Sequence, residues 1–220
     1  MSFFLLIIGS TDAIPLLIII NLVISLSLSP TLWRHVERGL WSRLLIGAVL
    51  GFPLGLAAFQ TANVNQLKIL AAGTILIFVA AAIIFRRAES RASGAQPRFR
   101  TASAVGVGSL AGAMTTALGM PGPVLMLYLA AVGAGKDAIR ATSLMFFAVA
   151  YAASLLLQLA TVGVSRWVWT TAGLLVPIAA VGALLGHQLS KRVSEGVFRT
   201  VVLGLIASTG MYVLFDALRS

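Results

Sequence analysis

The chain has 220 residues, of which 59% are hydrophobic and only 10% are charged. Its mean hydropathy of +1.00 lies far above the range of soluble domains and predicts an integral membrane protein with nearly all of its length inside the bilayer. Cysteine is absent, which excludes disulfides and thiolate chemistry, and the net charge of +10 comes from basic residues in short loops beside apolar runs, which indicates membrane topology rather than nucleic-acid binding.

Six apolar runs have about the length of a membrane-spanning helix, which needs roughly 20 residues. In chain order they cover residues 3–28, 44–59, 67–85, 139–161, 167–189 and 197–218. A further apolar run, 102–132, contains strong helix breakers in its middle. The sequence therefore predicts an all-α, polytopic transmembrane helical bundle without a soluble catalytic domain.

The first run is interrupted at residues 9–15 by glycine, polar residues and Pro15. Asp12 or Thr11 is expected to cap a helix that begins near this proline. The segment has no basic residues before its apolar part and is too long for a signal sequence, so we expect it to remain in the mature protein. Asn21 is a single polar side chain within this span, and either an interhelical hydrogen bond or a pore-lining position would explain it.

The second run contains Gly47, Gly51 and Gly55, and small residues at this spacing allow close approach of two helix backbones. The third run ends in the most basic stretch of the chain, 86–100, which also holds serine, glycine and proline and is typical of a linker. We therefore divide the chain into a first transmembrane repeat at 1–89, a basic linker at 90–100 and a second transmembrane repeat at 101–220.

The broken run reads Thr115-Thr116-Ala117-Leu118-Gly119-Met120-Pro121-Gly122-Pro123. Proline removes a backbone donor and glycine allows a positive φ, so two half-helices of about 17 and 10 residues are expected, the second beginning at Pro121 or Pro123. In a membrane, freed backbone groups are tolerated where protein or a water-filled cavity covers them. The alternative is a surface turn between two full spans.

An internal duplication is predicted, because an offset of 131 residues (182 − 51) places Gly51 and Gly55 on Gly182 and Gly186 and also aligns the hydrophobic blocks. The basic loops fall between different spans in the two halves, so the halves are expected to have opposite orientations. In that inverted repeat the break at 119–123 is the tip of a re-entrant hairpin. Its counterpart in the first half would map before Met1, so either this form is naturally short, or the start is placed late and a counterpart with a second breaker is missing.

These motifs resemble those of the sulfite exporter TauE/SafE family of membrane transporters, also called the TSUP superfamily. The resemblance rests on Gly-Met-Pro-Gly-Pro at 119–123, Tyr128 downstream, Arg-Ala-Thr-Ser at 140–143, Ile-Ile-Ile-Asn-Leu at 18–22 and the glycine-rich span 47–55. It implies two repeated helical halves that move sulfite, sulfonates, other organosulfur anions or small carboxylates across the inner membrane. The chain departs from the family in the N-terminal hairpin, where the family has a glycine-rich motif.

An anion inside a membrane needs hydrogen-bond donors and positive potential, which hydroxyl groups and helix N-termini supply. The candidate substrate-binding residues lie around the break, at the start of the next span and in the first span: Thr115, Thr116, Gly119, Pro121, Gly122, Pro123, Thr142, Ser143 and Asn21. For each hydroxyl the alternative is a bond to the carbonyl four residues earlier in its own helix. Gln158 is expected to bind another helix, with pore lining as the alternative, and Tyr151 is expected to pack.

Six acidic residues, nearly all in loops, offer no pair for general acid-base catalysis, and the sequence has neither a metal-ligand cluster nor a Walker motif. The sequence thus predicts a multi-pass, inner-membrane secondary transporter of small anions that works by alternating access, is not an enzyme and uses no cofactor. A non-transporting membrane subunit or assembly factor, an anion channel and an intramembrane enzyme are the alternatives. The expected partners are the anion and the lipid bilayer, with no nucleic acid, and a homodimer and a monomer both remain open.

Overall fold

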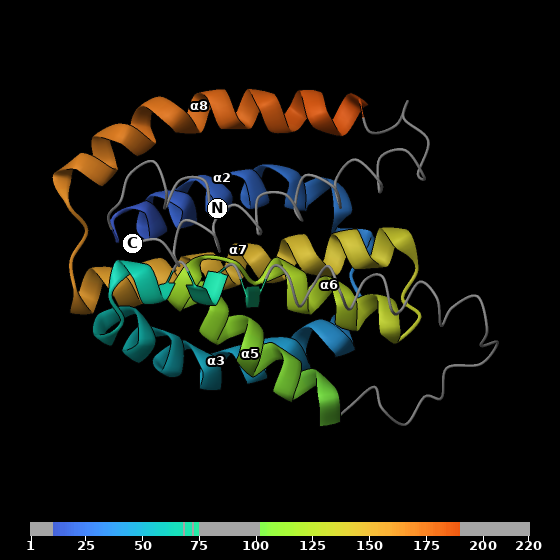
Figure 1. Cartoon of the computed structure of the whole chain (residues 1–220). Helices are drawn as coiled ribbons and strands as arrows, with labels where there is room; N and C mark the ends of the chain where they lie inside the picture. Colours follow the sequence, from blue (N-terminus) through green and yellow to red (C-terminus); the bar gives the residue numbers. More distant parts are fainter. Residues whose placement is uncertain (1–10, 68, 72, 75–101, 190–220) are drawn as a thin grey trace.

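The computed structural model describes residues 11–67, 69–71, 73–74 and 102–189 (Figure 1). Within these residues all regular structure is helical, which confirms the predicted all-α class. The elements are α2 (Ala13–Leu32), the short 3₁₀ helix η1 (Trp33–His35), α3 (Arg38–Thr61), α5 (Ala102–Leu118), α6 (Gly122–Ala131), α7 (Lys136–Thr161) and α8 (Arg166–Leu189). The predicted linker 90–100, the predicted run 197–218 and most of the predicted run 67–85 lie outside the described residues.

Three of the described helices are long and apolar enough to cross a membrane: Arg38–Thr61, Asp137–Thr161 and Arg166–Ala183. Shorter apolar helices cover Ala13–Ser29, Ser103–Leu118 and Gly122–Ala131. The predicted runs 44–59 and 139–161 lie within α3 and α7, and the run 167–189 coincides with α8 almost residue for residue. Hydropathy alone therefore located these three spans.

The helix α2 begins near Pro15 as predicted, but its capping differs from the prediction. The helix begins at Ala13, two residues before Pro15, and Asp12 occupies the N-cap position without a side-chain capping bond. Its backbone is helical (φ −59°, ψ −22°), whereas a capping carboxylate needs a non-helical backbone to reach the N–H groups of the first turn. The Asp12 carboxylate instead accepts a hydrogen bond from the Ser165 hydroxyl at 3.1 Å, which connects the start of α2 to the segment between α7 and α8.

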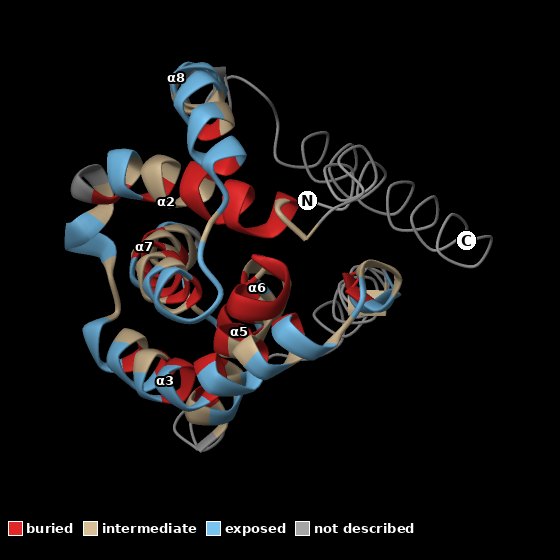
Figure 2. Cartoon of the chain, turned by 90° about the vertical axis from the view of Figure 1, so that its left-hand side faces the viewer, coloured by how far each residue is buried: buried red, intermediate tan, exposed pale blue. Residues whose placement is uncertain are grey.

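The long helix α7 lies in the middle of the described helices and packs against α2, α3, α5 and α6 (Figure 2). The last of the described helices, α8, packs against α2 at the edge of the described residues and leaves most of its length uncovered by them. In Figure 1, α2 and α8 run from left to right, whereas α3 and α7 run from right to left. The segments between α2 and α3 and between α6 and α7 therefore lie at the opposite end from the one between α7 and α8.

The closest helix pair is α3 with α5, joined along a line of small residues that we call the glycine seam. On α3 it consists of Gly47, Gly51 and Gly55, which face the backbone of Val105, Ser109 and Ala113; on α5 it consists of Gly108 and Gly112, which face Leu44 and Ala48. A Cβ atom added at any of these glycines would overlap the backbone of the opposite helix. The prediction that 47–55 serves close backbone approach is confirmed, and its partner is α5.

The predicted break is present between α5 and α6. The first of these helices has 17 residues and ends at Leu118, and the second has 10 residues and begins at Gly122. Gly119 has a φ of +65°, and its N–H closes the end of α5 by donating to the Thr115 carbonyl at 2.7 Å. Since Gly119 and Pro121 are both buried, the break lies inside the protein, which argues against a surface turn.

Candidate substrate-binding site at the broken helix

The two threonines before the break are buried completely. The Thr115 hydroxyl donates to the Ala111 carbonyl at 2.6 Å, so it is satisfied within its own helix. The Thr116 hydroxyl approaches the Gly112 carbonyl at 3.3 Å but also lies 2.9 Å from the hydroxyl of Ser154 on α7. Thr115 therefore bonds the carbonyl four residues earlier in its own helix, as serine and threonine often do in membrane helices. Thr116 instead takes part in a contact between two helices.

One face of α7 binds the C-terminal end of α5. The end of a helix leaves carbonyl oxygens without intrahelical partners, and α7 satisfies two oxygens here. The Gln158 amide Nε2 donates to the Thr116 carbonyl at 3.0 Å, and the Tyr151 hydroxyl donates to the Gly119 carbonyl at 3.3 Å. With Ser154, these side chains form a polar contact in an otherwise apolar span.

This polar face was only partly predictable. The expected interhelical bond of Gln158 is confirmed, and Tyr151 is buried as expected but also binds the break. Ser154 was missed. The available signal was spacing, because residues 151, 154 and 158 are separated by three and four positions and must share one face of a helix.

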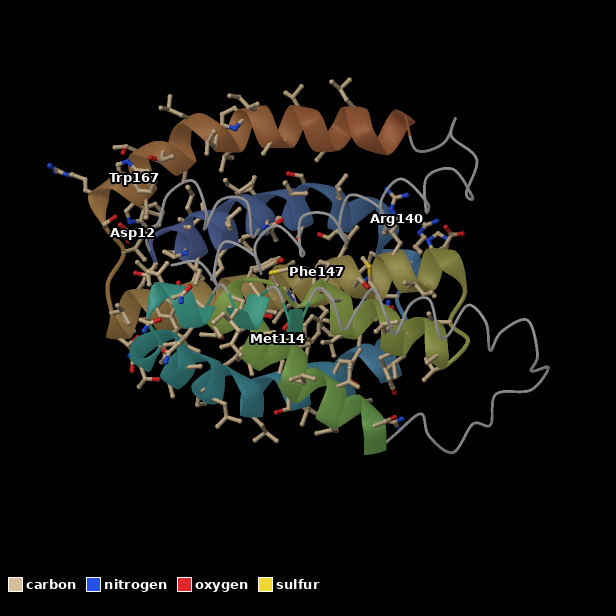
Figure 3. All side chains as sticks on the ribbon, in the orientation of Figure 1. Asp12, Met114, Arg140, Phe147 and Trp167 are labelled. Atoms are coloured by element: carbon tan, nitrogen blue, oxygen red, sulfur yellow. The ribbon has the colours of Figure 1, made fainter. Side chains whose placement is uncertain are left out.

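On the other side of the break, α6 begins with a proline-rich first turn. Proline has no N–H group, so Pro121 and Pro123 donate nothing and the donors of this turn are the N–H groups of Gly122 and Val124. Phe147 of α7 approaches this turn: a Cβ atom added at Gly122 would lie 3.5 Å from its ring. In Figure 3, Phe147 and Met114 occupy the middle of the molecule.

Ser143 lies one helical turn before Phe147 on α7, and side chains in a helix lean toward its N-terminus, so the Phe147 ring extends toward the turn that carries Ser143. The serine is 1% exposed, and its hydroxyl has no hydrogen-bond partner. Buried hydroxyls are nearly always paired, and an unpaired one carries a free-energy penalty of about 1–3 kcal/mol. Ser143 is thus a buried hydroxyl without a hydrogen-bond partner, one helical turn before the phenylalanine that approaches the first turn of α6.

The remaining predicted site residues lie elsewhere. The Thr142 hydroxyl accepts a hydrogen bond from the Glu37 backbone N–H at 3.3 Å, which connects α7 to the start of α3. Asn21 donates to the Leu17 carbonyl of its own helix at 2.8 Å. Thr142 and Ser154 are twelve positions apart on α7, about 18 Å along the helix axis, so Thr142 and Thr116 are not brought together.

The break presents opposite partial charges at its two ends. The C-terminus of α5 carries the negative end of a helix dipole, and the N-terminus of α6 carries the positive end. Two buried polar atoms of α7 have no hydrogen-bond partner: the Oε1 atom of Gln158, whose Nε2 atom binds the end of α5, and the hydroxyl of Ser143, one helical turn before Phe147. Within the described ranges, no group of three or more His, Cys, Asp or Glu residues could hold a metal ion.

A family model described as Sulfite exporter TauE/SafE matches residues 1–213, which is almost the whole chain. No curated protein and no solved structure matches significantly.

Proposed function

The chain belongs to the sulfite exporter TauE/SafE family, and we propose on that premise that it is a secondary carrier of small, sulfur-containing or carboxylate anions in the inner membrane. The family is one of membrane transporters and not of enzymes, so the chain is a multi-pass membrane protein that handles a small substrate. The substrate class, the mechanism and the binding residues below are our proposal.

The anion binds at the first turn of α6, and the observation that carries this proposal is the open hydroxyl of Ser143. An anion accepts hydrogen bonds, and Ser143 together with the N–H groups of Gly122 and Val124 offers donors without a buried full charge. Pro121 and Pro123 preorganise the turn, because their φ is already close to the helical value. Among the other predicted residues, Gly119 opens the break. Thr116 and Thr142 would hold neighbouring helices together, whereas Thr115 and Asn21 are satisfied within their own helices.

Alternating access would come from two inverted halves that move against each other around the break. Two observations support this part of the proposal. The helices that the 131-residue offset pairs, α2 with α7 and α3 with α8, run in opposite directions in Figure 1, as an inverted repeat requires. The basic residues Arg34, Arg38 and Arg140 lie at or near the α2–α3 and α6–α7 ends, which the positive-inside rule assigns to the cytoplasm. The break would then be the tip of a hairpin that enters from that side.

The first experiment is Ser143→Ala in detergent-purified protein, with thermal unfolding followed in sulfite, a simple sulfonate, acetate, sulfate and chloride at matched ionic strength. A ligand that binds only the folded state stabilises it by RT ln(1 + [L]/Kd), about 2.7 kcal/mol at a hundredfold excess over Kd. We expect one anion class to stabilise the wild type saturably and Ser143→Ala to lose that response. Without ligand, the variant should be as stable as the wild type or more so, because it no longer buries an unpaired hydroxyl.

Ser29→Ala is the matched control, since Ser29 is also a buried serine but its hydroxyl binds the Leu26 carbonyl of its own helix. It should keep the anion response. A stabilisation that follows only the general order of salts, or one that survives in Ser143→Ala, would contradict the proposed site. The decisive functional readout is uptake of the stabilising anion into proteoliposomes, and its absence would favour a non-transporting subunit.

A further inference from the structure

We propose that the C-terminal end of α5 holds a second site, for a small monovalent cation of about the size of sodium, formed by the Gln158 Oε1 atom with the hydroxyls of Ser154 and Thr116. The coupling of this cation to anion movement rests on the proposed transport function, whereas the binding itself rests on the geometry at α5. The site lies on the opposite side of the break from Ser143.

The orientation of the Gln158 amide decides which of its atoms is open. Nitrogen and oxygen of a side-chain amide are assigned from their partners. The Thr116 carbonyl can only accept a hydrogen bond, so the amide group 3.0 Å from it must be the NH₂ group. The other atom, Oε1, is then an acceptor, and it has no partner although Gln158 is 1% exposed. A buried acceptor of this kind requires a proton donor or a cation.

Two further oxygens belong to the residues next to this acceptor: the hydroxyl of Thr116, whose carbonyl binds the Gln158 amide, and the hydroxyl of Ser154. Ser154 precedes Gln158 by one turn on the same face of α7, and its hydroxyl is 2.9 Å from the Thr116 hydroxyl. Oxygen ligands lie about 2.3–2.6 Å from a calcium ion, an ion of nearly the same radius as sodium, so two oxygens about 3 Å apart can share one such ion. Both hydroxyls have lone pairs available for this purpose.

The helix end favours positive charge. The dipole of α5 places negative potential at its C-terminus, and broken membrane helices use such ends to coordinate sodium or protons. The three oxygens named here are neutral, which fits a monovalent ion better than a divalent one, because a divalent ion in a buried site is normally held by carboxylates. A bound anion at α6 and a bound cation at α5 would also reduce the cost of burying each charge.

The test measures unfolding temperature in sodium, potassium and N-methylglucamine chloride at equal ionic strength, without substrate anion. We expect sodium to raise the wild-type unfolding temperature saturably above the value in the other two salts. Gln158→Leu and Ser154→Ala should each weaken the apparent sodium affinity by at least about tenfold, the lower range for disturbing a metal site. Ser154→Ala guards against misfolding, because it leaves the Gln158 bond to α5 intact. Ser29→Ala should respond like the wild type.

Equal responses to the three salts would overturn the proposal and assign Gln158 Oε1 to a buried water molecule. A sodium response that survives in both variants would overturn it as well. The anion site and the cation site can be tested independently. Ser143→Ala should keep the sodium response while it loses the anion response. A sodium response with no anion response would remove the proposed substrate class but leave the cation site in place.

Discussion

Gly119 is the residue at which the chain can leave α5, because its φ of +65° lies in the left-handed region that other residues rarely adopt. The backbone groups on the two sides of this residue have different roles. Thr116 and Gly119 supply carbonyls that α7 binds, and Gly122 supplies an N–H group at the start of α6. Hydrogen bonds from α7 therefore hold the α5 side of the break, while on the α6 side its Phe147 ring approaches Gly122.

We predict that Gly119→Ala lowers the free energy of unfolding by about 1–2 kcal/mol, the cost of placing a Cβ atom in the left-handed conformation. Gly106→Ala is its control in the same helix. Gly106 has nothing within 4 Å of an added Cβ and sits in a helix interior, where alanine is favoured by about 0.5–1 kcal/mol. Chemical denaturation in detergent should show shifts of opposite sign. Equal shifts would mean that Gly119 does not carry the break.

For single residues, the sequence predicted the position of the backbone break better than it predicted the hydrogen-bond partners of the side chains. Glycine and proline located the break because they act on the backbone itself, independently of the rest of the fold. Thr115, Thr116 and Ser143 looked alike in sequence, yet the first is satisfied in its own helix, the second binds α7 and the third is open. Asp12 was expected to cap α2 and instead binds Ser165, 153 positions away. Such distinctions depend on which helix lies alongside.

At the scale of elements, the glycine seam joins α3 and α5 more closely than any side chain would permit. Membrane helices associate without a hydrophobic driving force between them, so van der Waals contact over small residues holds them together. The spacing of Gly47, Gly51 and Gly55 predicted such a contact correctly. It did not identify α5 as the partner, because small residues are compatible with any smooth helix face.

We predict that Gly51→Ala destabilises the protein by about 1–3 kcal/mol or more, the range for overpacking a closely packed interface, because its new methyl group would overlap the Ser109 backbone. The control is Gly182→Ala on α8, the position that the 131-residue offset pairs with Gly51. Nothing lies within 4 Å of a Cβ atom added there, so the change should be neutral or stabilising by up to about 1 kcal/mol. Thermal unfolding compares the two. Similar losses in both variants would contradict the seam.

At the scale of the whole molecule, α7 is central and α8 is peripheral (Figure 2). Hydropathy predicted the places of α3, α7 and α8, and the helix breakers predicted the separation of α5 from α6, because each span must satisfy its own backbone in lipid. They did not predict that α7 is the shared neighbour of α2, α3, α5 and α6. Both α7 and α8 read as apolar helices, and their different positions depend on contacts that only the folded chain defines.

The proposed inverted repeat predicts that equivalent residues of the two halves face opposite sides of the membrane. His35 and Arg166 form such a pair (166 − 35 = 131), and both are exposed. Because the chain has no cysteine, single substitutions His35→Cys and Arg166→Cys can be labelled with a membrane-impermeant reagent in cells and in inverted vesicles. We expect His35→Cys to react from the cytoplasmic side and Arg166→Cys from the other side. Labelling of both from one side would refute the inverted repeat.

The bonds between α7 and the break also set an order for biosynthesis. Translation produces α5 and α6 before α7. The Thr116 carbonyl has no partner until Gln158 is made 42 residues later, and the Gly119 carbonyl has none until Tyr151 is made 32 residues later. Unpaired carbonyls are costly in lipid, so the nascent α5–α6 segment must remain near water or the insertion machinery until α7 arrives. A nascent chain that has not yet delivered residue 151 to the membrane should therefore leave the break exposed. A longer nascent chain, which has also delivered residue 158, should cover it.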